Sequence, residues 1–237
     1  MFLYLQDKGT VARCHFAIVD YTFSDVNSET VPLAPREAMQ FGRALQRIIQ
    51  TIVQANPRCG PVHMSKIDIA DAFYRVWVQT ADVPKLGVAL PVAPGNPPLV
   101  AFPLGLPMGW VESPPYFTAL TETICDLANA KLADKKNAPP AHRLEQVAST
   151  PPAETPHPPV PCTITPSPSL GLASPRPPVG EVDIYVDDFL LLAQTKHQQN
   201  RVLRATPHSI DDVFWPVEPQ DPKHRKEPVS VKKNVKR

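Results

Sequence analysis

The sequence has no long hydrophobic run and few cysteines. Its longest apolar stretches, such as Leu86–Val92 and Phe189–Ala193, are far shorter than the ~20 residues of a membrane helix. The first residues have no basic segment followed by a long apolar one, so we expect no secretory signal and no membrane partner. The four cysteines are scattered. An intracellular protein with reduced thiols is therefore the expectation.

Net charge is also nearly absent, at +1, but it is unevenly distributed. The segment Lys223–Arg237 holds seven Lys or Arg and one Glu, which gives +6 and leaves −5 for the remaining residues. A basic tail of this kind can contact phosphates, although composition alone favours a solvated, frayed terminus. Nucleic-acid binding is thus not implied by the overall charge.

Proline is the residue in excess. There are 31 prolines among 237 residues, about 13% against a usual ~5%. Thirteen of them lie between Asp134 and Gly180, in a segment with few aromatic residues and no sustained hydrophobic period. We expect this segment to be a solvated, disordered insert, either a linker between domains or an insertion within one domain, with a helical turn or two at His142–Ala148 (HRLEQVA).

Both sides of the insert carry patterns of ordered structure. One helix is expected over Pro35–Gln54, and a second is expected to begin at Ser113 and to run towards Leu132. His63–Val78 begins with strand alternation, and Glu181–Ala193 is typical of a hairpin with a tight acidic turn. The expected buried stripe of the first helix is Phe41, Leu45, Ile48 and Ile52, and that of the second is Phe117, Leu120, Ile124 and Leu127.

Carboxylates stand at the ends of two of the expected strands. Asp68 closes a short apolar strand, and Asp187 and Asp188 lie between two apolar strands. Adjacent like charges repel each other, and a hard divalent cation such as Mg²⁺ removes that repulsion because it prefers carboxylate oxygen. The alternatives are a turn-capping role for Asp68 and a solvated hairpin tip for the Asp-Asp pair.

The sequence carries two weaker signals of a functional site besides these acids. The segment Phe102–Pro114 is a Gly- and Pro-containing loop that leads directly into a helix, and glycine there permits close approach of a ligand to the backbone. An ordinary strand-to-helix connection is the alternative. Cys59 and His63 have the spacing of half a zinc site, but no second pair stands near them, so an unrelated thiol and histidine are favoured.

In their order and spacing, these motifs resemble the palm of reverse transcriptases from retroviruses and LTR retrotransposons. Asp68–Phe73 (DIADAF) is similar to the first palm motif, Leu106–Pro114 (LPMGWVESP) to the next, and Tyr185–Asp188 (YVDD) to the catalytic hairpin. Ile18–Tyr21, with Asn27, resembles the preceding fingers strand. The resemblance covers residues 13–133 and 181–215.

The resemblance implies an α+β fold: a reverse-transcriptase palm with a split β-α-β, ferredoxin-like arrangement and partial fingers, interrupted by the Pro-rich insert. Its parts would be partial fingers with a connecting helix (1–60), the first part of the palm (61–133), the insert (134–180), the palm hairpin (181–215) and a basic tail (216–237).

The implied activity is metal-dependent transfer of dNTPs to a primer 3′-hydroxyl on an RNA or DNA template. Asp68, Asp187 and Asp188 would be both the catalytic acids and the ligands of two Mg²⁺ ions, with Mn²⁺ as an alternative ion. The implied substrate-binding residues are Phe73, Met108, Gly109, Trp110 and Tyr185. Phe73 would exclude a 2′-hydroxyl, although core packing also explains Phe73 and Trp110.

Two departures from the family pattern bear on activity. Met108 stands where the family often has a hydrogen-bonding Gln. Phe16 stands where a basic residue is common, and the nearest base is Arg13. We therefore expect weak or absent activity in this chain. The alternatives are a non-catalytic retroelement remnant that binds nucleic acid through its basic tail, and a Pro-rich ligand for SH3- or WW-type partners.

Overall fold

The computed structural model describes residues 3–6, 16–134, 136, 138–148, 163–164, 176–214 and 235–236. The chain divides into two compact units, each made from separate stretches of sequence. The first unit holds Met1–Arg36 and Asp71–Phe117, and the second holds Glu37–Ala70 and Thr118–Arg237. The class is α+β with antiparallel sheets, as predicted. Within the described residues, no helix combines the length and the hydropathy needed to cross a membrane.

The second unit is built on one antiparallel sheet. Its central strand, β3, pairs with β8 on one side, and β8 pairs with β7. Two short strands, β6 and β9, pair with opposite ends of the other edge of β3. The bounds are β3 Val62–Ile69, β6 Thr163–Ile164, β7 Gly180–Tyr185, β8 Asp188–Ala193 and β9 Val235–Lys236.

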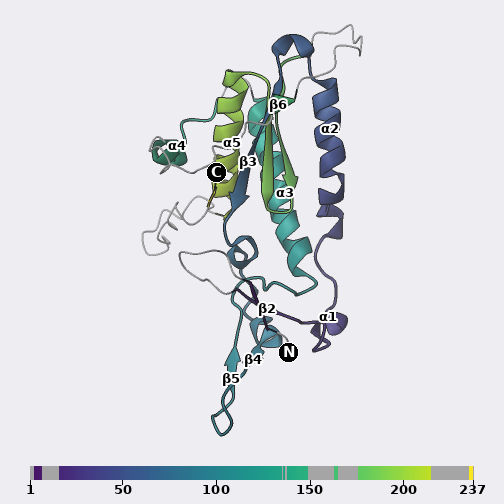
Figure 1. Cartoon of the computed structure of the whole chain (residues 1–237), viewed down its shortest axis with the longest axis vertical. Coiled ribbons are helices and arrows are strands. Elements are labelled where there is room, and N and C mark those ends of the chain that lie inside the picture. Colours follow the sequence, from purple (N-terminus) through teal and green to yellow (C-terminus); the bar gives the residue numbers. More distant parts are fainter. Residues whose placement is uncertain are drawn as a thin grey trace. The chain divides into compact units, whose positions relative to one another are not determined.

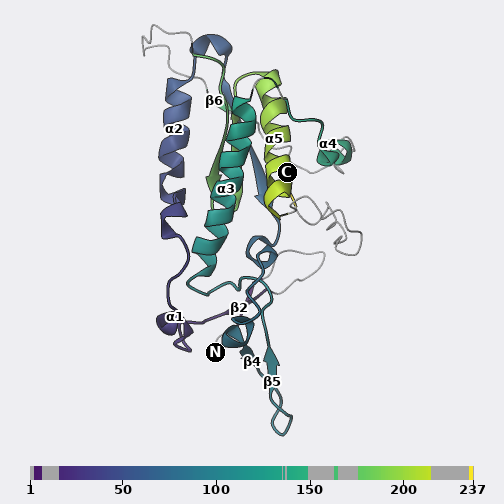
Figure 2. The ribbon, with the colours of Figure 1, turned by 180° about the vertical axis from the view of Figure 1, so that it is seen from behind.

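Two long helices cover one face of this sheet, and a third flanks its β7 edge. Helix α3 (Ser113–Ala133) and helix α5 (Lys196–Phe214) lie on the same face in both views (Figures 1 and 2). Helix α2 (Ala44–Gln54) runs beside β7. The helix predicted to begin at Ser113 is confirmed. Its first turn is fixed by the Ser113 hydroxyl, which donates to the carbonyl of Pro107 at 2.7 Å.

The helix expected over Pro35–Gln54 is shorter than predicted. Only Ala44–Gln54 is α-helical, preceded by 3-10 turns at Arg36–Ala38 and Phe41–Arg43. Its buried stripe is Ala44, Ile48 and Ile52, so the prediction that Leu45 is buried was wrong. Ile48 and Ile52 pack with Val62 and Leu192 in the core of the second unit.

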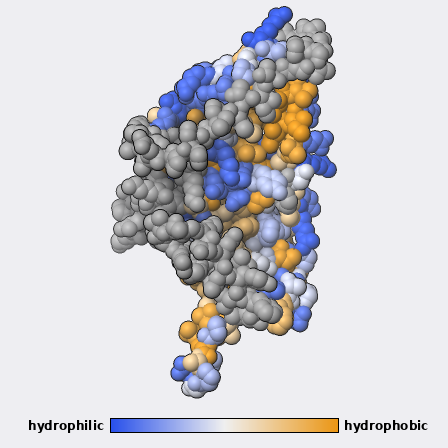
Figure 3. All heavy atoms as spheres, in the orientation of Figure 1, coloured by the Kyte–Doolittle hydropathy of each residue, from blue (hydrophilic) through white to orange (hydrophobic). Residues whose placement is uncertain are grey.

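Leu45 lies instead on an exposed apolar row of α2 together with Ile49 and Val53. The three side chains are 69%, 51% and 46% exposed. Figure 3 shows the corresponding hydrophobic patch over α2. Their spacing of four residues places them on one ridge of the helix. The sequence of α2 therefore contains two apolar stripes. In the folded protein, the stripe that begins at Ala44 is buried and the stripe that begins at Leu45 is exposed.

Part of the Pro-rich insert is folded. Helix α4 (Arg143–Ala148) is joined to α5 by two ion pairs, Arg143–Asp211 at 2.8 Å and Arg204–Glu145 at 2.9 Å. The imidazole of His142, which is 3% exposed, also bonds Asp211. The helical turn expected at His142–Ala148 within the insert is therefore confirmed. Most of the remaining insert, and nearly all of the basic tail, lie outside the described residues.

The first unit has two small antiparallel hairpins and a short helix. The buried side chains of Tyr21, Leu86 and Val88 form its core, and the Tyr21 hydroxyl donates to the carbonyl of Leu86 at 3.0 Å. The element bounds are β1 Leu3–Gln6, β2 Phe16–Val19, α1 Val26–Glu29, β4 Val88–Leu90 and β5 Leu99–Ala101, with 3-10 turns at Ala72–Arg75 and Val83–Leu86. A further 3-10 turn, Pro57–Cys59, belongs to the second unit.

Candidate functional site

The pairing of β3 with β8 places two of the predicted acids opposite each other. In the antiparallel register, Asp68 is the direct partner of Asp188. Directly opposed residues on one face have Cβ atoms about 5 Å apart, so two carboxylates at this position lie close together. The flanking residues Ile67, Ile69 and Phe189 are buried and fix the register.

The third acid is held by the hairpin between β7 and β8. Tyr185 pairs with Asp188, so the turn itself consists of Val186 and Asp187. Val186 has φ 60°, in the left-handed region, whereas Asp187 is not among the positive-φ residues. This is the pattern of a type II′ turn, which favours glycine at its first position. A β-branched residue there is strained, and backbone strain of this kind is typical of functional sites.

Together, Asp68, Asp187 and Asp188 form a cluster that could hold a metal ion. Each offers a carboxylate oxygen, and these oxygens all lie within 4.8 Å of one another. All three residues are partly buried. Carboxylate oxygens are the ligands preferred by Mg²⁺ and Mn²⁺ rather than by softer metals, so the donor set fits the ions that the sequence predicted. In the described part of the chain, no other group of three His, Cys, Asp or Glu residues meets this criterion, and Cys59 with His63 does not.

The surroundings of Asp187 disfavour its charged form. Burial raises the pKa of Asp187 above its ordinary value, and the charges of Asp188 and Asp68 raise it further. The ammonium of Lys66 opposes this shift. Lys66 lies two residues before Asp68 on β3, and its Nζ is 2.5 Å from Oδ1 of Asp188. Sequence reasoning missed Lys66, because only the strand register shows that it reaches Asp188.

The loop of the second motif lies in the first unit, with Gly109 at its tip. Gly109 has φ 95°, and a Cβ there would lie 2.2 Å from the carbonyl oxygen of Val19. Only glycine fits this close approach of two backbone segments. The Asn27 side chain then joins the loop to α1: its amide donates to the Gly109 carbonyl at 3.0 Å, and its oxygen accepts from the Val111 N–H at 2.9 Å.

The side chains of Trp110 and Glu112 attach this loop to the distant segment from Thr30 to Arg36. The indole N–H of Trp110 donates to the Thr30 hydroxyl at 3.1 Å. The Glu112 carboxylate, 1% exposed, accepts from the backbone N–H groups of Leu33 and Ala34, both at 2.9 Å. Arg36 lies 3.4 Å from its other oxygen. Burial alone would raise the pKa of Glu112, but these hydrogen bonds and the Arg36 charge outweigh burial, and the pKa lies below its ordinary value.

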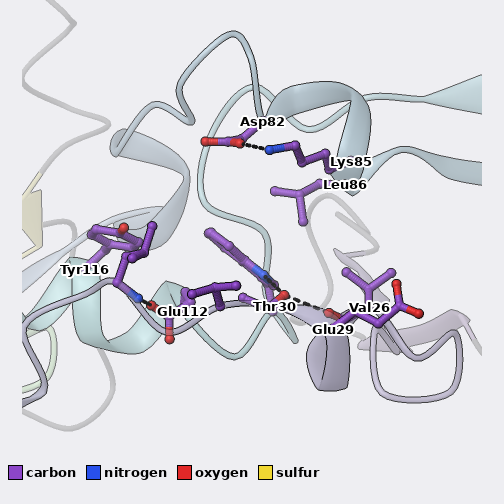
Figure 4. Close-up of a pocket in the computed structure, with 11 residues that line it drawn as sticks. Val26, Glu29, Thr30, Asp82, Lys85, Leu86, Glu112 and Tyr116 are labelled. Atoms are coloured by element: carbon purple, nitrogen blue, oxygen red, sulfur yellow. Dashed lines mark hydrogen bonds and ion pairs between the residues drawn. The ribbon is translucent and has the colours of Figure 1, made fainter.

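A cavity of about 460 Å³ opens beside this loop, within the first unit. Glu112 and Tyr116 line one part of it, and the exposed ion pair between Lys85 and Asp82 lies on another (Figure 4). Trp110 also lines the cavity. The Trp110 ring is stacked on Tyr116, with ring centroids 6.3 Å apart. Both carboxylate oxygens of Glu112 already accept hydrogen bonds from other residues of the chain, so this side chain stabilises the loop.

The remaining predicted site residues divide between the two units. Phe73 and Met108 are partly buried in the first unit, and the Phe73 ring packs against the fully buried Phe117 at a centroid distance of 4.9 Å. Tyr185 stands at the end of β7 in the second unit and is 51% exposed. The structure thus brings the three acids together. Arg13 and the Phe16 side chain lie outside what the structure describes.

Comparisons with known proteins add no family to this picture. A scan against protein-family models finds no match, and a search of curated proteins finds no similar sequence.

Proposed function

We propose that this chain is the palm and part of the fingers of a reverse transcriptase, which transfers deoxynucleotides to a primer 3′-hydroxyl on an RNA or DNA template. The observation that carries the proposal is the convergence of three carboxylates. Asp68 and Asp188 are 120 positions apart in the sequence, yet they meet on neighbouring strands within reach of one ion. Each stands in a motif that resembles a motif of this family.

The strand order of the second unit supports the same proposal. Across the sheet, the strands lie in the order β9-β3-β8-β7. Along the chain, β3 is followed by α3, the β7–β8 hairpin, α5 and β9. This is the order of a split β-α-β, ferredoxin-like unit, with both helices on one face (Figure 2). The family resemblance implies such a unit for the palm, with the acids on β3 and at the hairpin turn.

In the proposed reaction, Asp68, Asp187 and Asp188 hold the divalent ions. When bound, the ions supply charge stabilisation for the triphosphate and lower the pKa of the attacking hydroxyl. The residues of the chain orient these ligands: the β3–β8 register fixes Asp68 and Asp188, and the strained turn at Val186 fixes Asp187. Positioning and electrostatics account for most of the rate in phosphoryl and nucleotidyl transfer.

Four of the proposed substrate-binding residues belong to the first unit and one to the second. Phe73, Met108, Gly109 and Trp110 are assigned to the nucleotide, and Tyr185 of the second unit to the primer end. The indole N–H of Trp110 is bonded to Thr30, and its backbone N–H and carbonyl are bonded to Pro107 and Ser113, so Trp110 would contact a substrate through its ring. Met108 offers no hydrogen bond, so we expect weak affinity for the incoming nucleotide.

Primer extension on an RNA template with Mg²⁺ tests the proposal. Removing one metal-binding acid by Asp188→Asn should reduce extension by at least about 100-fold, since charge stabilisation in the transition state is lost. Asp126→Asn, an exposed acid on α3, is the matched control and should leave extension unchanged. Extension that persists in Asp188→Asn would refute the role of that acid. Template-primer binding with no extension by the wild-type chain would instead support the non-catalytic remnant.

A further inference from the structure

The acidic cluster already contains one cation that belongs to the chain. Lys66 and Asp68 are two residues apart on β3 and therefore share a face of the strand. Asp188 lies opposite Asp68, so Lys66 is its diagonal neighbour, a distance that a long side chain spans. The ammonium of Lys66 rests 2.5 Å from Oδ1 of Asp188. The charges of Asp68 and Asp187 also act on it.

We propose that Lys66 is a built-in counter-ion that competes with divalent metal for the carboxylate of Asp188, and that metal binding requires the ammonium to leave. This inference rests on the metal centre of the proposed function. Lys66 is a residue that sets the metal affinity of that centre. It is not itself a metal ligand, since an ammonium offers three donors and no lone pair.

Ligand geometry supports the competition. Mg²⁺ binds carboxylate oxygen at about 2.0–2.1 Å and tolerates little distortion of its octahedral shell. A metal that binds Oδ1 of Asp188 needs the position that the close ammonium of Lys66 holds. The positive charges of the ammonium and the metal also repel each other. The ammonium therefore has to leave this oxygen before a metal binds there.

Exposure allows the exchange to occur. The Lys66 side chain is 52% exposed, so its flexible stem can turn towards water without leaving an ammonium buried. The ion pair between Arg47 and Asp183 in the same unit is different. The Arg47 Nε lies 3.0 Å from one Asp183 oxygen and 3.1 Å from the other, and the Asp183 side chain is only 6% exposed. Arg47 is thus a fixed structural partner, whereas Lys66 is a releasable one.

The net charge of the cluster determines how strongly it attracts a divalent ion. Three carboxylates carry −3, and Lys66 reduces this to −2 before any metal binds. The ammonium thereby lessens repulsion among the acids in the metal-free protein, and it lowers the gain from binding a divalent ion. Removing its charge should tighten metal binding by about three- to tenfold, a modest factor because the pair is half exposed and screened.

The experiment is a titration of the full chain with Mn²⁺, with free ion measured by electron paramagnetic resonance at one fixed pH. Lys66→Met removes the charge and keeps an apolar stem, and Lys66→Arg keeps the charge. Lys131→Met is the matched control, because Lys131 pairs with Asp212 at 2.6 Å and lies outside the cluster. We expect tighter binding by Lys66→Met alone, and a smaller difference from wild type at high salt.

The outcomes separate this inference from the proposed function. If Asp188→Asn abolishes binding while Lys66→Met binds as wild type does, the metal centre stands and the role of Lys66 is overturned. If Lys66→Met binds Mn²⁺ and the wild-type chain does not, the competition is supported and catalysis by the native chain is contradicted. If neither Asp188→Asn nor Lys66→Met differs from wild type in Mn²⁺ binding, both the metal centre and the role of Lys66 are overturned.

A second measurement covers the case in which Lys66→Met folds poorly. Lys66→Gln removes the charge but retains a polar side chain, and its thermal melting is compared with and without Mn²⁺. The rise in melting temperature caused by Mn²⁺ should be larger in this variant than in wild type, because metal relieves repulsion that Lys66 no longer relieves. An equal or smaller rise would overturn the proposal.

Discussion

Two groups of carboxylates in this molecule have opposite environments. Glu112, in the first unit, is buried, and both of its oxygens are engaged by donors from Leu33, Ala34 and Arg36. Asp68, Asp187 and Asp188, in the second unit, face one another with a single half-exposed ammonium among them. The pKa of Glu112 is lowered and that of Asp187 is raised. The Glu112 carboxylate is held by donors of the fold, whereas the three clustered aspartates could hold a metal ion.

The comparison predicts its largest effect at Glu112. Replacement by Gln leaves two backbone donors facing a neutral amide and removes the Arg36 pairing, so the first unit should lose about 2 kcal/mol of stability. Hydrogen exchange of the Leu33 and Ala34 amides measures this loss locally. Glu29→Gln, an exposed acid in the same unit, is the control. Unchanged protection in Glu112→Gln would contradict the structural role of Glu112.

The pH dependence of this effect has a definite sign. A carboxyl whose pKa is lower in the folded state stabilises the fold above its ordinary value of 4.5 and loses that contribution as pH falls through the lowered value. The stability difference between wild type and Glu112→Gln should therefore be full at pH 6 and should shrink at acid pH below 4.5. A difference that grows on acidification would contradict this assignment.

The opposite effect is expected at Asp187. In the absence of metal, Asp187→Asn should stabilise the protein by about 0.5 kcal/mol, because it removes repulsion with Asp188 and Asp68. Since a raised pKa makes the charged form costly, the gain should be present at neutral pH and vanish as acid protonates Asp187 in the wild type. Urea unfolding in a chelator measures it, with Asp126→Asn as control. Destabilisation by Asp187→Asn would show that the cluster is not strained by charge.

The smallest effect concerns the backbone of the same turn. Val186→Gly relieves the left-handed strain of a β-branched residue but adds entropy to the unfolded chain, so the two contributions largely cancel and the net gain should stay below about 0.5 kcal/mol. Val182→Gly, within the buried part of β7, is the contrasting variant and should destabilise strongly. Equal losses in the two variants would argue that Val186 is not strained.

The acids were predictable from sequence because they belong to local patterns. Asp68 ends an apolar strand, and the alternation in Glu181–Ala193 fixed both strands and the turn of the hairpin. The roles of Lys66, Asn27 and Glu112 were not predictable, because each depends on a partner far away in the chain: Asn27 bonds Val111, and Glu112 bonds Leu33. No short-range period marks such contacts.

The misplaced prediction for α2 has a similar physical cause. The sequence of α2 has two adjacent apolar stripes. The stripe that contains Ile48 and Ile52 is the buried one because it packs against Val62 and Leu192 of the sheet. Local propensity was overridden by tertiary contacts there. In the insert, the helical turn expected at His142–Ala148 is confirmed by α4, and its ion pairs with α5 through Arg143 and Glu145 depend on distant partners that the sequence does not reveal.

The central claim is that distant acids share one cation, and iron-mediated cleavage tests it most directly. When hydrogen peroxide and ascorbate are added, Fe²⁺ bound in place of Mg²⁺ reduces the peroxide to hydroxyl radicals, which cut the backbone near the metal ligands, and mass spectrometry maps the cuts. The account predicts two clusters of cuts, one near Asp68 and one near Asp187 and Asp188, both suppressed by excess Mg²⁺ and both lost in Asp188→Asn. Cuts at only one of these positions, or cuts that Mg²⁺ does not suppress, would contradict a shared metal centre.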